Sequence, residues 1–210
     1  MAIPDRDALP SHQADELVRA FLTYVLIPAW LVPGVLDWAF HRKTKIECNA
    51  GAHESLTHIL MALEAGAGIA MGLFLEVDAG VIAAMAGSAL VHEATAIWDV
   101  GYTVPRRHIS QAEQHTHSFL EVLPFVAAAF AAFAHPEQTR ALAGIGSGAP
   151  RFAFRFKRTP PRAATVIAVV ASALFGIAPY AEEMVRCLRV APTLAPQPPP
   201  VVQPPPDAEI

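Results

Sequence analysis

The sequence predicts an all-α integral membrane protein: a bundle of about five transmembrane helices, four of which frame a histidine and carboxylate site at one membrane face. Composition indicates the class, because 53% of the 210 residues are hydrophobic and only 16% are charged, whereas soluble domains carry about 25% charged residues. The apolar residues are also gathered into runs close to the length that a membrane-spanning helix needs. These runs cover residues 20–40, 55–76, 79–98, 117–134 and 163–181.

Each run has features of a membrane helix. The first is expected to be a retained helix rather than a signal peptide, because it follows a mixed-charge segment and has no small-residue cleavage site behind it. Its prolines, Pro28 and Pro33, should kink the helix without ending it, since a broken backbone is costly in lipid. A tight turn with Glu76 and Asp78 separates the second and third runs. The fourth run is near the short limit, and Gly and Ala are frequent in all five, as is usual for helices that pack in lipid.

The rest of the chain divides into a membrane domain and a tail. Residues 1–190 form the predicted membrane helical domain, and the Pro-rich residues 191–210 form a predicted disordered tail. Residues 136–162 are the longest internal connection, and their alternating phenylalanine and basic residues suit a segment at the membrane surface. The net charge of −4 argues against a nucleic-acid partner. Two cysteines are too few for a disulfide framework.

Histidine and acidic residues gather at one end of the predicted helices. We name the end of the bundle where the first helix begins side A, and the opposite end side B. Because consecutive helices alternate in direction, the ends of the first and third helices and the starts of the second and fourth all lie on side B. These ends carry residues 37–41, 54–58, 92–99 and 113–121. The side A turn holds no histidine and His135 stands alone there, so solvation of helix ends does not explain the asymmetry.

Spacing within these stretches predicts a metal site. In three of them an acid precedes a histidine by four residues, which puts both on one helix face. Ionisable groups in a bilayer are costly and usually face a partner or a functional cavity. Imidazole and carboxylate suit iron, zinc or manganese, and di-iron sites are built this way in helix bundles. The predicted ligands are His41, Glu54, His58, His92, Glu113 and His117. The predicted additional ligands or orienting residues are Asp37, Glu47, His53, Glu93, Asp99, His115 and Glu121.

Simpler interpretations exist for single motifs. Glu54 could serve only as a favourable charge at a helix start. Trp38 and Trp98 are expected in an interfacial belt on side B. Arg106 and Arg107 are interpreted as orientation signals or lipid phosphate contacts rather than catalytic groups. Basic residues in the short side B loops place that side in the cytoplasm of a bacterial-type inner membrane, although the basic segment 151–162 favours the opposite orientation.

With these residues in view, the chain resembles the histidine-box integral-membrane di-iron enzymes, namely fatty-acid desaturases, hydroxylases and alkane monooxygenases. The resemblance covers residues 37–121, where those enzymes also gather histidines at the cytoplasmic ends of membrane helices. The usual HxxxH and HxxHH boxes are absent, and the nearest pieces are HESLTH and HTH. The resemblance implies two iron ions and a membrane-embedded oxidoreductase that acts on a lipid-like or hydrocarbon substrate. No nucleotide-binding motif is present, so an electron-donor protein or a quinone would supply the reductant.

Three alternatives remain open at this stage. The first is a zinc-dependent membrane lipid hydrolase, in which three histidines and an acid hold zinc, and Glu54 or Glu113 acts as the general base. The second is a haem-binding or electron-transfer subunit with His58 and His92 as axial ligands. The third is an accessory subunit of a larger membrane complex, tethered by the Pro-rich tail.

Overall fold

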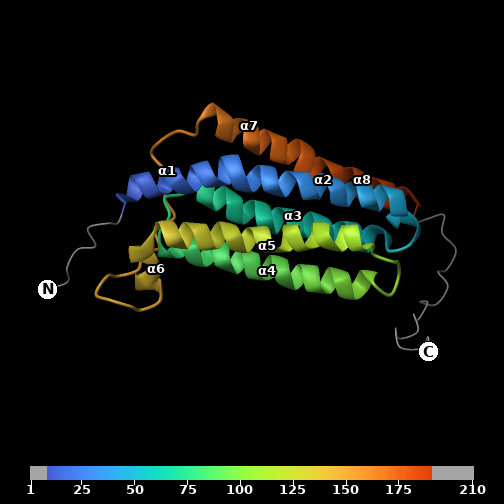
Figure 1. Ribbon diagram of the computed structural model, residues 1–210, viewed down its shortest axis with the longest axis horizontal. Coiled ribbons are helices and arrows are strands. Elements are labelled where there is room, and N and C mark those ends of the chain that lie inside the picture. Colours follow the sequence, from blue (N-terminus) through green and yellow to red (C-terminus); the bar gives the residue numbers. More distant parts are fainter. Residues whose placement is uncertain (1–8, 191–210) are drawn as a thin grey trace.

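The structure is a computed structural model that describes residues 9–190, so the predicted Pro-rich tail lies outside the described residues. It confirms the predicted all-α bundle, in which five helices are long and apolar enough to cross a membrane and lie side by side along their lengths (Figure 1). These helices fit an integral membrane protein. The five spans are Ser11–Thr44, Gly51–Phe74, Ala79–Thr103, Gln111–Ala134 and Ala163–Val190.

The first span is continuous through both of its prolines. It consists of α1 (Ser11–Phe21), a π turn (Leu22–Leu26) and α2 (Ile27–Thr44). Pro28 is the second residue after the π turn, and such local adjustments allow membrane helices to tolerate the missing N–H of proline. A second π segment, Ser172–Ile177, joins α7 (Ala163–Ala171) to α8 (Ala178–Val190). The hydroxyls of Thr23 and Thr165 are 3.1 Å apart, which links the first span to the fifth near side A.

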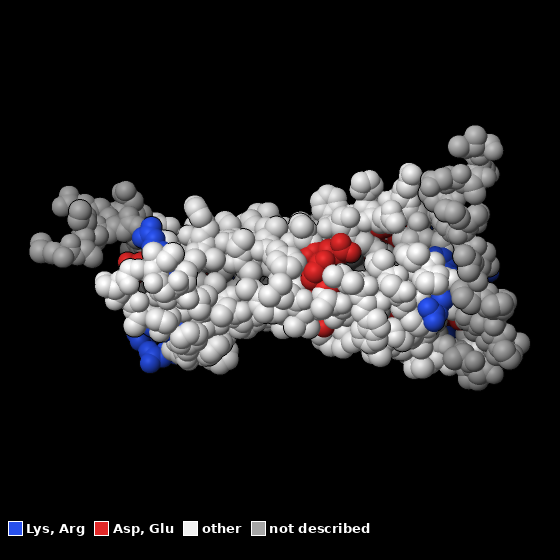
Figure 2. Space-filling model, turned by 90° about the horizontal axis from the view of Figure 1, so that it is seen from below, with Lys and Arg blue, Asp and Glu red and all other residues white. Residues whose placement is uncertain are grey.

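The inner helices position the site. Helix α3 (Gly51–Phe74) contacts α4 (Ala79–Thr103) along much of its length, and it also contacts α8. Helix α5 (Gln111–Ala134) packs against α4 and α2, so it closes the bundle on the side away from α7 and α8 (Figure 1). The face shown in Figure 2 has its basic groups toward the two ends and an acidic patch between them, and most of the remaining surface is uncharged, as expected for a bundle surrounded by lipid.

The long connection after α5 covers side A, the end on which the helix count places it. It begins with the short α6 (Pro136–Leu142), and residues 151–157 then run along the turn between α3 and α4. The amide N–H of Glu76 donates to the carbonyl of Arg155 at 2.7 Å, and that of Gly80 donates to the carbonyl of Arg151 at 2.9 Å. A Cβ on Gly80 would lie 3.0 Å from the ring of Phe154, so this close approach requires glycine.

His135, the lone histidine that follows α5 on side A, has an acidic partner. Its Nε2 lies 3.3 Å from Oδ1 of Asp15, which belongs to the first span and is far from His135 in the sequence. The Lys157 ammonium lies 3.9 Å from the same carboxylate oxygen of Asp15. It also donates hydrogen bonds to the backbone carbonyls of Asp15, at 3.1 Å, and of Gly72, at 2.5 Å. This second polar group ties the connection to α1 and α3, which gives it a structural role.

Lys157 should make stability depend on alkaline pH. Burial lowers the pKa of its ammonium to about 8, against the attraction of Asp15, while an unfolded chain keeps a lysine pKa of about 10.4. The unfolded state therefore binds more protons in this window, and stability rises as the pH increases from about 8 to about 10. We expect the thermal unfolding midpoint of the detergent-solubilised protein to rise across this range. Lys157→Met should remove that rise, and parallel pH profiles for the two proteins would contradict this assignment.

Candidate metal centre

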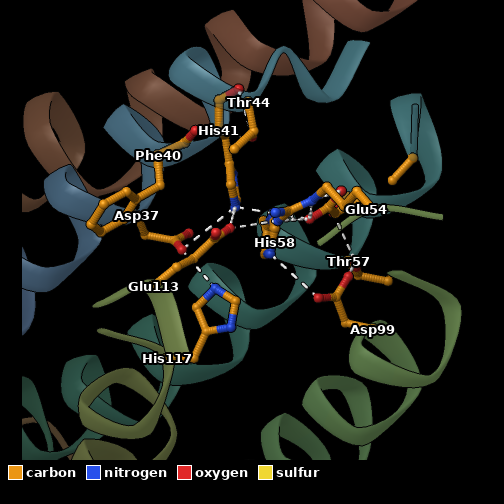
Figure 3. Close-up of polar contacts among 12 residues, drawn as sticks. Asp37, Phe40, His41, Thr44, Glu54, Thr57, His58, Asp99, Glu113 and His117 are labelled. Carbon is orange, nitrogen blue, oxygen red and sulfur yellow. Dashed lines mark hydrogen bonds and ion pairs between the residues drawn. The ribbon is translucent and has the colours of Figure 1, made fainter. Parts of the chain in front are cut away.

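Four helices bring the predicted acids and histidines together at side B. The acid-x-x-x-His pairs of α2, α3 and α5 all point inward, and α4 adds one carboxylate (Figure 3). Six of the seven side chains belong to residues that are at most 4% exposed, and His117 is half-buried. The residues are Asp37, His41, Glu54, His58, Asp99, Glu113 and His117.

The helix ends and the connections between them determine the positions of these side chains. Helix α2 ends at Thr44, the next residue Lys45 adopts a left-handed conformation (φ 51°), and a short 3₁₀ turn (Ile46–Cys48) leads into α3. This tight connection places His41 opposite Glu54. At the start of α5, Ser110 and Glu113 form a capping box: the Ser110 hydroxyl accepts the Glu113 N–H at 3.3 Å, and a Glu113 carboxylate oxygen accepts the Ser110 N–H at 3.4 Å. The box holds the Glu113 carboxylate at the helix terminus.

The Nε2 atom of His41 lies among three carboxylates. It is 3.5 Å from Oδ1 of Asp37, 3.6 Å from Oε1 of Glu113 and 3.9 Å from Oε1 of Glu54. This nitrogen is fully buried and has no hydrogen-bond partner within residues 9–190, whereas Oε1 of Glu113 lies 2.7 Å from the Arg107 guanidinium. Buried polar groups are normally paired, so the imidazole nitrogen and the carboxylates around it converge where a cation would satisfy them.

The other two histidines extend the site in two directions. His117 Nε2 lies 2.7 Å from Oδ1 of Asp37. His58 Nε2 lies 3.5 Å from Oδ2 of Asp99, whose other oxygen accepts a hydrogen bond from the Thr57 hydroxyl. The rings of His41 and His58 are stacked, with centroids 4.5 Å apart.

Two overlapping sets of ligand atoms result, and His58 belongs to both. In each set the ligand atoms lie within 4.8 Å of one another. We name them the histidine-rich set (Asp37, His41, His58 and His117) and the carboxylate set (Glu54, His58 and Asp99).

The fifth span contributes two residues that the sequence reasoning missed. Oε2 of Glu183 lies 2.9 Å from Nδ1 of His41, and its Oε1 lies 3.7 Å from Nδ1 of His58. The Tyr180 hydroxyl donates to Oδ2 of Asp37 at 3.0 Å. A carboxylate on Nδ1 fixes the imidazole tautomer and leaves Nε2 for a metal, which is the usual outer arrangement at metal sites. The helix-direction count already contained the signal, because the fifth helix also ends on side B, but its apolar run stops at 181.

Arg107 lies at the site, so the interpretation of this residue as an orientation or lipid-contact residue was wrong. Its guanidinium donates through Nε to both oxygens of Glu54, at 3.0 and 3.1 Å, and its side chain lies 2.7 Å from Oε1 of Glu113. Burial alone would lower the pKa of Arg107, but hydrogen bonds and attraction from Glu54 and Glu113 raise it above its usual range. Arg107 therefore remains charged and closes the site from the loop between α4 and α5. Arg106, in contrast, is exposed and stacks on Tyr102.

The structure does not bring His92 into either set. Its Nδ1 lies 3.1 Å from the carbonyl oxygen of Met61 and 4.0 Å from a Glu64 carboxylate oxygen. The seven-residue spacing from Asp99 keeps both residues on one face of α4, but it separates them by about 10 Å along the helix axis. The prediction considered the shared face and neglected this axial distance.

The remaining predicted residues surround the site. Glu47 forms an ion pair with Arg186, and His53 stacks on Tyr102 with a centroid distance of 3.7 Å. Glu93 is half-buried and His115 is exposed. Glu121 lines a cavity next to the histidine-rich set. None of these five belongs to either ligand set among the described residues.

The buried charges of the centre do not balance. Five buried carboxylates face one buried guanidinium, which leaves a formal charge of −4 when the imidazoles are neutral. Protonation of the three site histidines would still leave −1, whereas two divalent cations would neutralise the centre. Uncompensated buried charge is strongly unfavourable. The carboxylates counted are Asp37, Glu54, Asp99, Glu113 and Glu183.

Glu183→Gln should weaken metal binding while preserving side-chain size. The amide loses the charge that both Nδ1 atoms face, and changes in such outer partners typically cost about 10–100-fold in metal affinity. Glu182→Gln is the matched control, because Glu182 is exposed and bonds only Trp38, Arg42 and Arg186 among the contacts described. Chelator competition on purified protein measures the difference, and equal affinities for the two variants would exclude this role for Glu183.

The chain was compared with known proteins at three levels. No family model, curated protein or solved structure gives a significant match.

Proposed function

We propose that this chain is a membrane-embedded, metal-dependent oxidoreductase that holds two iron ions at side B and acts on a lipid-like or hydrocarbon substrate. The observation that carries the proposal is the convergence of two ligand sets on His58 in a centre with five carboxylates and one guanidinium. Two divalent cations balance that charge. Carboxylates and histidines from facing helices are also the donor set of di-iron proteins built on helix bundles.

The residues of the centre would have distinct roles. The Nε2 atoms of His41 and His58, together with Asp37 and Asp99, would hold the metals, and Glu183 would orient both imidazoles. Bound iron would supply the redox chemistry with oxygen. The chain's own contribution is a buried, preorganised set of ligands, which Arg107 covers toward side B.

A lipophilic substrate suits the surroundings of the site. Beside the histidine-rich set lies a cavity whose wall includes Trp30, Ala62, Ala96 and Leu120. All four belong to spans long enough to cross a membrane. A substrate could therefore reach the site from lipid, and an electron-donor protein or a quinone would provide reducing equivalents. We assign side B to the cytoplasmic face of a bacterial-type inner membrane on the basic residues of its short loops.

A zinc-dependent lipid hydrolase is the second candidate, because the histidine-rich set is three histidines and one aspartate, a donor set that zinc accepts. In that case Glu113 would be the general base beside a zinc-bound water. The haem and accessory-subunit alternatives gain no specific support, since a porphyrin needs no surrounding carboxylates.

Elemental analysis with an absorption spectrum of detergent-purified protein tests the proposal. We expect about two iron atoms per chain after expression in iron-supplemented medium, without a strong Soret band. Zinc alone would favour the hydrolase, and a Soret band would favour haem. Protein without stoichiometric transition metal would reject both metalloenzyme candidates.

A further inference from the structure

A cavity extends from the histidine-rich set toward the middle of the bundle. Asp37, His58, His117 and Tyr180 form its end at the site, and His92 lies farther along α4. The space open to the centre of a water molecule is about 40 Å³, several times the roughly 10–15 Å³ that one water requires. The cavity is only partly enclosed, and Val100 and Glu121 are among its more accessible wall residues. The cavity is therefore not fully sealed by the surrounding helices.

His92 presents a free acceptor to this cavity. A carbonyl oxygen can only accept, so the 3.1 Å contact with Met61 places the imidazole proton on Nδ1. In the neutral ring Nε2 is then an unprotonated acceptor. The residue is 3% exposed, and Nε2 has no partner within the described residues. A buried acceptor of this kind is costly unless a donor reaches it.

The neighbouring acid does not change this assignment. The nearer carboxylate oxygen of Glu64 is 4.0 Å from Nδ1, beyond hydrogen-bonding distance and at the other nitrogen of the ring. Its second oxygen accepts from the Thr95 hydroxyl at 2.9 Å. Nε2 therefore remains the polar atom that His92 offers to the cavity.

We propose that this cavity binds a lipophilic molecule with a free hydroxyl group, such as a long-chain alcohol or a quinol, and that His92 Nε2 accepts the hydrogen bond from that hydroxyl. The inference rests on the proposed function, because the molecule bound beside the metal ligands is taken as the substrate. The apolar wall would contact the part of the hydrocarbon chain next to the hydroxyl, and His92 selects for the O–H group. His92 is thus a specificity-determining residue rather than a metal ligand.

Photolabelling in lipid nanodiscs tests this directly. The probes are a diazirine-bearing long-chain alcohol and its methyl ether, which has the same chain but no O–H to donate. We expect the alcohol to label peptides of the cavity wall, such as those with Ala96 and Leu120, about tenfold more than the ether does, as one hydrogen bond of about 1.4 kcal/mol predicts. Equal labelling by both probes, or labelling spread over lipid-facing surfaces, would overturn the inference.

Four variants test the role of His92 and the location of the probe in the cavity. His92→Phe should abolish the preference for the alcohol, whereas His92→Gln, which keeps an acceptor oxygen, should retain part of it. His115→Phe is the control for the same substitution at an exposed site. Gly34→Leu should reduce labelling by both probes, because Gly34 lines the cavity and a Cβ there meets no atom within 4 Å. Retention of the full preference by His92→Phe would reject the role of His92.

Metal content separates the two proposals. Each preparation is analysed for metal and labelled both before and after chelation. Selective labelling of protein that never binds metal would support the hydroxyl site and reject the metalloenzyme. Metal-replete protein without selective labelling would reject the hydroxyl site alone.

Discussion

His58→Ala is expected to remove metal binding from the whole centre, with an affinity loss of at least about 100-fold. His58 is the one residue that the histidine-rich set and the carboxylate set share. Its ring also stacks on His41 at 4.5 Å, and its Nδ1 faces Glu183, so its removal disturbs the orientation of the remaining ligands. Loss of either Asp99 or His117 alone affects only one set, and such variants should retain metal at the other.

His53→Ala is the matched control, because it makes the same substitution in the first turns of α3 at a ring that stacks on Tyr102 outside both sets. Metal per chain, measured on monodisperse protein with wild-type helicity, is the readout. If His58→Ala kept half of the wild-type metal, one metal would be held independently of this histidine, and the arrangement in which both sets share His58 would have to be abandoned.

Much of the fold could be predicted because lipid imposes a simple rule on the sequence. Runs of apolar residues locate the spans, and alternation of helix direction then fixes which ends meet. The fifth helix continues to Val190, beyond the run that ends at 181, because its last turns carry polar residues such as Glu183 and Arg186. Those turns are amphipathic rather than apolar, and they bury their polar side against α2 and α3. Composition therefore left these turns outside the fifth apolar run.

The site residues were predictable where the helix face and the position along the helix axis both pointed to the same place. Glu54 and His58 share a helix face and also lie at a side B end, so both the angular and the axial position were specified. For His92 only the face was correct, and the axial offset places it in the adjacent cavity. Arg106 and Arg107 cannot be told apart by spacing, because the loop geometry alone turns one guanidinium outward onto Tyr102 and the other inward onto Glu54.

Arg107→Gln is expected to destabilise the metal-free protein much more than the metal-loaded protein. Without metal, Arg107 is the only guanidinium among the described contacts of Glu54 and Glu113, both of which are fully buried. Breaking a buried ion pair from one side costs about 3–5 kcal/mol, which corresponds to a fall in the unfolding midpoint on the order of 10 °C for a chain of this size. Bound cations would neutralise the same carboxylates, so the loss should be several-fold smaller once metal is present.

Thermal unfolding of chelated and metal-loaded protein in the same detergent measures this difference. Arg106→Gln is the control, since it removes the neighbouring guanidinium from an exposed position and should shift neither midpoint appreciably. An equal loss with and without metal would mean that Arg107 stabilises the loop independently of the centre, and that cations do not share its carboxylates. A loss confined to the metal-free protein would instead establish that Arg107 and the metals compensate the same buried charge, which is the electrostatic requirement underlying the metal centre.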